Sequence, residues 1–228
     1  MTKRGDTMQY DFDFLFMLEK FPVLLQKGAT MTVEMTLITL CLGSFIGAVL
    51  AIMRISKVKL LNWIAAVYVW AFRGIPMIVL LFFLYYALPS AGITFSPMVA
   101  SIFALTLVSS SYMCEIIRGG ILSIPKGQFE AAHSLGFTYL QQMIHLIIPQ
   151  TLRSIVPPTG NEFIGIMKDT AIVSTVAMVE TVRVAQQIGA TTFRYIEIYI
   201  DAALIFLLMT SVFTVVFNRV EKHLAKKF

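Results

Sequence analysis

Several ionisable residues lie within otherwise apolar stretches of this sequence, and the side chains of four of them are the first candidates for chemistry. They are Arg73, Glu162, Lys168 and Asp169. A charged side chain inside a bilayer costs about 2.5–3.5 kcal/mol on insertion scales, so such residues commonly line a polar pathway or pair within the protein. With two neighbours they form our candidate pathway for a polar solute: Arg73, Gly74, Glu162, Lys168, Asp169 and Thr170.

The surroundings of Arg73 admit two interpretations. Gly74 loosens a helix and Pro76 removes a backbone donor, so a helix broken here would present a new N-terminus, which favours a carboxylate or another anion. Alternatively, Arg73 lies near the inner interface with its guanidinium reaching water, and the membrane span begins at Pro76. The sequence leaves both interpretations open.

The acidic residues are equally ambiguous. Glu162 could meet the ammonium group of a solute or form an ion pair within the protein. Lys168 and Asp169 are neighbours in the chain, so on a helix they point about 100° apart and need not pair with each other. They could contact opposite ends of a zwitterion or lock adjacent helices, and the hydroxyl of Thr170 suits either role.

Catalytic chemistry finds no support in the sequence. The three histidines form no Ser/His/Asp or Cys/His arrangement, and Cys41 and Cys114 have no metal-ligand spacing. The chain also has no GxxxxGK[ST] loop to hold the phosphates of ATP. We therefore expect a protein that is not an enzyme and binds neither a metal nor a cofactor itself.

Composition places these residues in a membrane. Of 228 residues 57% are hydrophobic and 14% are charged, and the mean hydropathy is +0.79, whereas soluble domains carry about 25% charged residues. The net charge of +5 does not indicate nucleic-acid binding, because the basic residues are spread over short loops and the C-terminus, as orientation in a membrane requires.

The apolar runs predict an all-α integral membrane fold with about five transmembrane helices. A span needs about 20 apolar residues to cross the hydrocarbon. The runs are 28–53, 60–88, 96–117, 155–179 and 198–217, of which the second is interrupted at Arg73–Pro76 and the fourth at Lys168–Thr170.

The distribution of Lys and Arg predicts the orientation. With the C-terminus in the cytoplasm, ten basic residues lie inside and six outside, which favours an outer N-terminus and a multi-pass topology. We expect three segments. Residues 1–25 form an outer segment, either an amphipathic helix or an irregular terminus; residues 26–220 form the transmembrane domain; and residues 221–228 form a basic cytoplasmic tail.

Residues 125–150 are too polar to span a bilayer and predict a cytoplasmic helical hairpin. Pro125 can start a first helix, and Gly136 suits a left-handed position at its end. Thr138 and Gln141 have the spacing of a capping box that starts a second helix, which Pro149 ends or kinks. From these features alone, the hairpin is either a docking site for a partner or a structural surface element.

The same stretch resembles the EAA loop of bacterial ABC importer permeases. Glu130-Ala131-Ala132 are followed by Gly136 and then, after nine residues, by "LIIP" at 146–149, with Leu146 and Ile148 as conservative departures. Segments such as "FRGIP", "NEFI" and "KDTAIVS" extend the resemblance over about residues 24–228, to the subfamily that imports polar amino acids.

The resemblance implies five to six helices per subunit, a second permease subunit, two cytoplasmic ATPase subunits that bind ATP and Mg²⁺, and an extracytoplasmic solute-binding protein. It implies location in the bacterial cytoplasmic membrane, with transport of a polar amino acid. The residues implied in coupling to the ATPase are Gly127, Glu130, Ala131, Ala132 and Gly136. The alternatives are a stand-alone secondary transporter or channel that uses the intramembrane charges and, less consistent with the sequence, a membrane enzyme.

Overall fold

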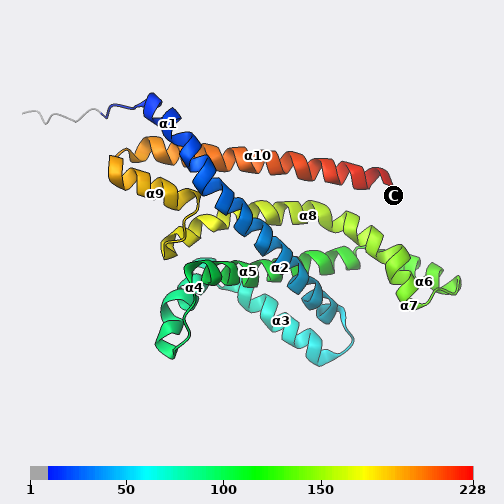
Figure 1. The fold of residues 1–228 in the computed structure, drawn as a ribbon. Helices are drawn as coiled ribbons and strands as arrows, with labels where there is room; N and C mark the ends of the chain where they lie inside the picture. Colours follow the sequence, from blue (N-terminus) through cyan, green and yellow to red (C-terminus); the bar gives the residue numbers. More distant parts are fainter. Residues whose placement is uncertain (1–9, 228) are drawn as a thin grey trace, which may run out of the picture.

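The computed structural model describes residues 10–227, and within that range the chain is helical and contains no strand. Figure 1 shows the arrangement. The α-helices are α1 (Phe14–Leu24), α2 (Thr30–Ile55), α3 (Lys59–Gly74), α4 (Met77–Phe82), α5 (Pro97–Leu122), α6 (Lys126–Ser134), α7 (Tyr139–Gln142), α8 (Ile148–Asp169), α9 (Thr181–Thr192) and α10 (Tyr195–Lys227). Short π and 3₁₀ segments join several of them, among them the π segments η1 (Leu25–Ala29), η2 (Phe83–Ala87) and η4 (Met143–Ile147) and the 3₁₀ segments η3 (Leu88–Ala91) and η5 (Thr170–Val176).

The first helix includes part of the expected outer segment. The side chain of Asp13 accepts a hydrogen bond from the Phe16 N–H at 2.9 Å and caps α1. From there the chain stays helical through η1 to Ile55, a stretch of 42 residues. The described part of the expected outer segment is therefore continuous with the first span, and no structural break occurs at residue 25. Residues 1–9 lie outside the described part of the chain.

The second predicted span is broken where the sequence indicated. α3 ends at Gly74, Ile75 is extended, and α4 begins after Pro76, with a bend of 99° between the two helical segments. Pro76 has no N–H to continue the hydrogen bonds of α3, and it disfavours helical backbone at Ile75. The interruption predicted from Arg73–Pro76 is thus confirmed.

α2 and α5 pack closely because two glycines of α2 face α5. A Cβ at Gly43 would lie 2.7 Å from the Ser109 hydroxyl, and one at Gly47 would lie 2.6 Å from the Met113 Cβ. Small residues four apart let membrane helices approach closely. Within this chain the pair serves packing between its own helices.

The region from α6 to α8 follows part of the predicted pattern. Gly136 has φ +80°, and Thr138 and Gln141 form the capping box. Helical structure does not end at Pro149, because the wider π turn of η4 precedes it and the Ile148 N–H bonds to the Met143 carbonyl. Such a turn changes the hydrogen-bond pattern and accommodates a proline that lacks an N–H.

The predicted count of five spans is not confirmed. Among the described residues, three helices are long and apolar enough to cross a membrane, and the broken pair α3–α4 makes a fourth. α8, at the predicted span 155–179, carries Glu162, Lys168 and Asp169 and is not among these apolar helices, so this fifth span stays a prediction.

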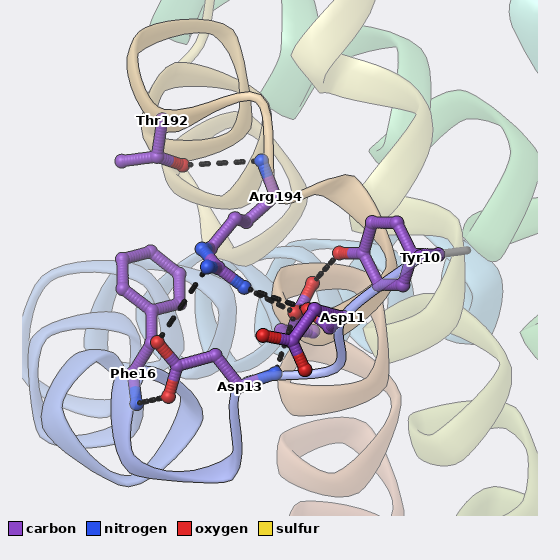
Figure 2. Close-up of polar contacts among 7 residues, drawn as sticks. Tyr10, Asp11, Asp13, Phe16, Thr192 and Arg194 are labelled. Atoms are coloured by element: carbon purple, nitrogen blue, oxygen red, sulfur yellow. Dashed lines mark hydrogen bonds and ion pairs between the residues drawn. The ribbon is translucent and has the colours of Figure 1, made fainter. Parts of the chain in front are cut away.

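A cluster of polar contacts ties the beginning of the described chain to the start of α10 (Figure 2). The buried carboxylate of Glu197 accepts hydrogen bonds from Tyr10 Oη, from the Asp13 N–H at 3.0 Å and from Arg194 Nη1 at 3.0 Å. Arg194 also forms an ion pair with Asp13 at 3.7 Å and donates to the Asp11 carbonyl at 3.2 Å. These contacts hold α1 against α10.

The two ends of the bundle agree with the predicted topology. Figure 1 shows α6, α7 and the C-terminal end of α10 at one end of the molecule, and α9 with the beginning of α1 at the other. The side chain of Arg153 reaches the Ala225 carbonyl at 3.5 Å, which joins the start of α8 to the end of α10. Segments that the sequence assigns to one side of the membrane therefore lie together, whereas which side faces the cytoplasm stays a prediction.

Candidate functional site

A cavity of about 520 Å³ lies at the break between α3 and α4. Its walls come from the broken segment, the middle of α5, and the C-terminal half of α8 with the adjoining 3₁₀ turn. The polar or charged residues that line it are Arg73, Ser109, Tyr112, Glu162 and Asp169. Small-molecule sites typically enclose about 300–1,000 Å³, so this cavity has room for a small solute.

The basic side of the cavity is Arg73. Its guanidinium carbon lies 5.0 Å from the centroid of the Tyr112 ring, within the range of a cation–π interaction. Arg73 is exposed in the isolated chain, so one side of the cavity is open. The contact with Tyr112 holds the cation beside the helix break while its N–H donors stay accessible to a ligand.

The acidic side comes from α8. Glu162 and Asp169 are seven residues apart, about two helical turns, so they point to the same face of the helix. Both are half-buried and both line the cavity with Arg73. The tertiary structure therefore places one guanidinium and two carboxylates around one space, an arrangement that suits a solute carrying both charges.

Two of the predicted pathway residues do not line this cavity. Lys168 is exposed and lines a different cleft, with Tyr199 and Phe206 of α10. Thr170 is buried, and its hydroxyl donates to the Met167 carbonyl at 2.7 Å. Gly74 does line the cavity. A Cβ at this position would meet no atom within 4 Å, so the packing does not require a glycine here.

Sequence reasoning missed Ser109 and Tyr112. The run Ser109-Ser110-Ser111-Tyr112 interrupts an apolar span with four hydroxyl side chains, and this signal could have drawn attention to α5. Within the described residues, no group of three or more His, Cys, Asp or Glu side chains is placed to hold a metal ion.

The sequence matches a known family over most of its length. Residues 43–228 match the pattern of the family described as "Binding-protein-dependent transport system inner membrane component". The chain belongs to this family. Its members are membrane permeases, and the chain is therefore a transport subunit rather than an enzyme.

Curated relatives agree with this assignment. The permease is 36% identical over 213 residues to the L-cystine transport system permease protein TcyB of Bacillus subtilis (strain 168), a match that covers 91% of each chain. It is 35% identical over 215 residues to the arginine transport system permease protein ArtQ of the same organism, covering 94% of this chain and 98% of that one.

Solved structures share the fold. A chain in the structure titled "Crystal structure of an amino acid ABC transporter with histidines" superposes with a TM-score of 0.88 at 36% identity, covering 94% of the permease and 100% of that chain. A chain of the MetNI methionine ABC transporter has a TM-score of 0.74 at 20% identity and covers 93% of the permease, which shows the same fold. The chain is thus a transmembrane permease subunit of an ATP-driven importer. The comparisons do not favour the alternative of a stand-alone transporter or channel.

The predicted coupling residues of the permease lie on and after α6. Gly127, Glu130, Ala131 and Gly136 are exposed, whereas Ala132 is buried against the rest of the chain. Two large apolar side chains nearby are also exposed, Leu135 by 77% and Tyr139 by 70%. The structure therefore presents this surface to solvent, and its use for coupling stays a prediction.

A separate ion-pair network lies at the end of α5 nearer α6. Glu115 binds Arg118 at 2.6 Å, and the Nε of Arg54 lies 3.8 Å from the same carboxylate. Arg54 also donates to the Asn62 side chain at 2.8 Å. These contacts join α2, α3 and α5, so Glu115 and Arg118 have structural partners in the permease.

Proposed function

We propose that the permease carries an amino acid in its zwitterionic form through the cavity at the α3–α4 break. The observation that carries this proposal is that Arg73, Glu162 and Asp169 line one cavity. The names of the relatives support it, since they include permeases for L-cystine and arginine.

The charges suggest how such a solute is held. The guanidinium of Arg73 can bind an α-carboxylate through two N–H donors, and its contact with Tyr112 limits its motion. Glu162 or Asp169 can accept hydrogen bonds from the α-ammonium. Pairing both ends of the zwitterion reduces the cost of taking each charge out of water. Lys168 and Thr170 have structural roles in this proposal, because neither lines the cavity.

A second permease subunit, the same or a related chain, closes the open side of the cavity in this proposal. Arg73, Gly74 and Pro76 are exposed in the isolated chain although they border the candidate site. A pathway through a bilayer must be enclosed by protein, because exposed irregular backbone is tolerated only against protein or a water-filled cavity. The second subunit would also cover the non-helical backbone at Ile75.

Transport is driven by ATP that separate subunits bind, not by ATP bound to this chain. The complex contains two ATP-binding subunits, which hold ATP and Mg²⁺, and one of them docks on the surface of α6 around Gly127, Glu130, Ala131 and Gly136. Exposed Leu135 and Tyr139 supply apolar area for this contact, and buried Ala132 fixes α6 to the chain. The chain itself binds no cofactor.

The proposed location is the bacterial cytoplasmic membrane, with the end that carries α6 and the C-terminus inside. The excess of Lys and Arg on the segments at that end supports this orientation. The opposite end, with α9 and the start of α1, then faces the extracytoplasmic solute-binding protein.

Direct binding to the assembled transporter tests the site without the solute-binding protein. The complex is purified in detergent, and binding of radiolabelled arginine, glutamine and cystine is measured together with competition by the corresponding amino-acid amides. We expect at least one of these amino acids to bind and its amide, which lacks the carboxylate, to compete weakly. Equal competition by the amide would show that Arg73 does not recognise the carboxylate.

A further inference from the structure

The solute cavity at the α3–α4 break has more acidic than basic side chains. The charged residues that line it are Arg73, Glu162 and Asp169, one guanidinium and two carboxylates. The neighbouring cation, Lys168, lines another cleft. Within the part of the chain whose side chains are described, neither carboxylate forms an ion pair, although both are half-buried. A carboxylate removed from water without a cation is costly, so the second one needs a positive partner.

The two carboxylates are too far apart to bind the same ammonium group. Glu162 and Asp169 are seven residues apart on α8, which corresponds to about 10 Å along the helix axis. Helical side chains lean toward the N-terminus of their helix, so both carboxylates shift in the same direction. Two oxygens that accept from one nitrogen lie at most about 6 Å apart, because each N–O distance is about 3 Å. The α-ammonium of a solute therefore pairs with one carboxylate and leaves the other without a cation.

The wall between the two carboxylates is apolar. Ile166 lies about one turn from Glu162 and from Asp169 on the same face of α8, and it lines the cavity together with Leu105 of α5. Methylene groups packed against these two side chains would be removed from water, which is favourable. Along α8 the cavity thus presents a carboxylate, an apolar patch and a second carboxylate.

Contacts at two levels show how α5 and α8 run past each other. A Cβ at Gly120 of α5 would lie 2.3 Å from the side chain of Ile155 on α8. Toward the other end, Leu105 of α5 belongs to the same buried cluster as Val173, which follows α8 in η5. Higher residue numbers on α5 therefore face lower numbers on α8, and the two helices are antiparallel.

This antiparallel packing places Arg73 at the Glu162 end of the cavity. Tyr112 is two turns further along α5 than Leu105, so Tyr112 lies toward Glu162 and Leu105 toward Asp169. The contact of Arg73 with the Tyr112 ring brings the guanidinium to the same end. The carboxylate and the ammonium of an amino acid are attached to one carbon atom, so Arg73 and Glu162 together suit this pair of groups.

A buried hydroxyl adds a further hydrogen-bonding group to the cavity. Of three consecutive serines on α5, Ser110 donates to the Leu107 carbonyl at 3.0 Å and Ser111 to the Val108 carbonyl at 2.6 Å. Ser109 is 1% exposed and lines the cavity, and its hydroxyl oxygen has no hydrogen-bond partner among the described residues. A buried polar group without a partner is costly, and this oxygen can accept from the ammonium of a solute.

We propose that the cavity selects an amino acid with a cationic side chain. Arg73 binds its α-carboxylate, Glu162 its α-ammonium and Asp169 its side-chain cation, while its methylene groups lie along Ile166. Three lining side chains carry a net charge of −1 and such a solute carries +1, so every charge in the occupied cavity has a partner. This inference rests on the proposed function and names the substrate class of the same site.

Arginine and citrulline form the ligand pair that tests the assignment, since they have the same length and citrulline replaces the guanidinium with a neutral group. Binding of both is measured on the purified complex in detergent without the solute-binding protein. We expect wild type to bind arginine at least about tenfold more tightly, because hydrogen bonds between charged groups are the stronger ones. Asp169→Asn should lose this preference by weakening the binding of arginine and not that of citrulline.

Two further variants separate the roles of the side chains. Glu162→Gln should weaken both ligands by a similar factor and keep the preference for arginine, because both ligands have an α-ammonium. Lys168→Gln is the matched control, since its side chain lines another cleft, and it should bind both ligands like wild type. Loss of the preference in Glu162→Gln instead of Asp169→Asn would contradict the assignment.

The wild-type measurement also distinguishes this inference from the proposed function. Equal affinity for arginine and citrulline, with weak competition by their amides, would overturn the selectivity for cations and leave the proposed zwitterion site standing. Absence of binding by every amino acid tried would overturn both. If Asp169→Asn does not assemble, Asp169→Glu keeps the charge and should keep the preference, and the wild-type ratio of affinities still decides.

Discussion

The guanidinium of Arg73, at the end of α3, lies 5.0 Å from the ring centroid of Tyr112 on α5. One residue precedes Gly74 and the other lies on α5, so this contact spans two membrane helices and borders the cavity that contains Glu162 and Asp169. It defines the basic side of the proposed solute site.

Replacement of Arg73 should therefore weaken solute binding. We expect Arg73→Gln to weaken amino-acid binding by at least about tenfold, because a charge-assisted hydrogen bond is worth roughly 1.5–3 kcal/mol. Binding of radiolabelled solute to purified complex measures this. Lys59→Gln, an exposed residue at the start of α3, is the control. Wild-type affinity in Arg73→Gln would place the carboxylate of the solute elsewhere.

Substitution of Glu162 or Asp169 should reduce transport more than substitution of Lys168. We expect Glu162→Gln or Asp169→Asn to reduce ATP-driven uptake into proteoliposomes at least about tenfold, the effect of losing one charged contact. Lys168→Gln should keep most of the activity because its side chain lines another cleft. Normal uptake in both acid variants, with the complex assembled, would rule out this site.

Coupling to the ATPase should require a glycine at position 136, because the backbone there has a positive φ. Its φ of +80° is strained for a residue with a Cβ, and we expect Gly136→Val to cost about 1–2 kcal/mol and to shift the turn before Thr138. Transport-linked ATP hydrolysis and copurification of the ATPase subunit should both fall. Gly119→Ala, which lies outside the α6 surface, is the control, since a Cβ there meets no atom within 4 Å. Unchanged coupling in Gly136→Val would contradict the docking role.

Close packing of α2 on α5 should make Gly47 intolerant of any side chain. A Cβ at this position would lie 2.6 Å from the Met113 Cβ, so we expect Gly47→Ala to destabilise the protein by about 1–3 kcal/mol through overpacking. Thermal unfolding in detergent reports the change. Gly119→Ala, at a site with open space, should unfold like wild type.

The polar cluster around Glu197 should stabilise the packing of α1 against the start of α10. We expect Glu197→Gln to increase hydrogen exchange in α1, because the ion pair with Arg194 is lost and the bond from Tyr10 weakens. Arg183→Gln, on α9, is the control.

The same cluster predicts an alkaline transition in α1. The hydrogen bond to Glu197 raises the pKa of Tyr10 above its usual value. Its contribution is therefore complete below the ordinary pKa, about 10 for tyrosine, and is lost as the pH rises through the raised value. The protection of α1 amides, relative to their intrinsic exchange rate at each pH, should stay constant near neutral pH and fall in that alkaline range, and Tyr10→Phe should abolish the transition.

Local signals in the sequence were sufficient for several elements. Pro76 located the break after α3, Gly136 the left-handed turn, and Thr138 with Gln141 the start of α7, because each acts on neighbouring backbone. The apolar runs predicted the helices that are long and apolar enough to cross a membrane, whereas the span at 155–179 stays a prediction because α8 carries three charged side chains.

The sequence by itself determined that the chain is a helical membrane protein, where its helices break and turn, and that charges lie within apolar segments. Only the tertiary structure decided that Arg73, Glu162 and Asp169 share one cavity with Tyr112 while Lys168 faces another cleft. The reason is physical. Caps, turns and proline breaks depend on residues within a few positions, whereas a shared cavity depends on how helices far apart in the chain pack against each other.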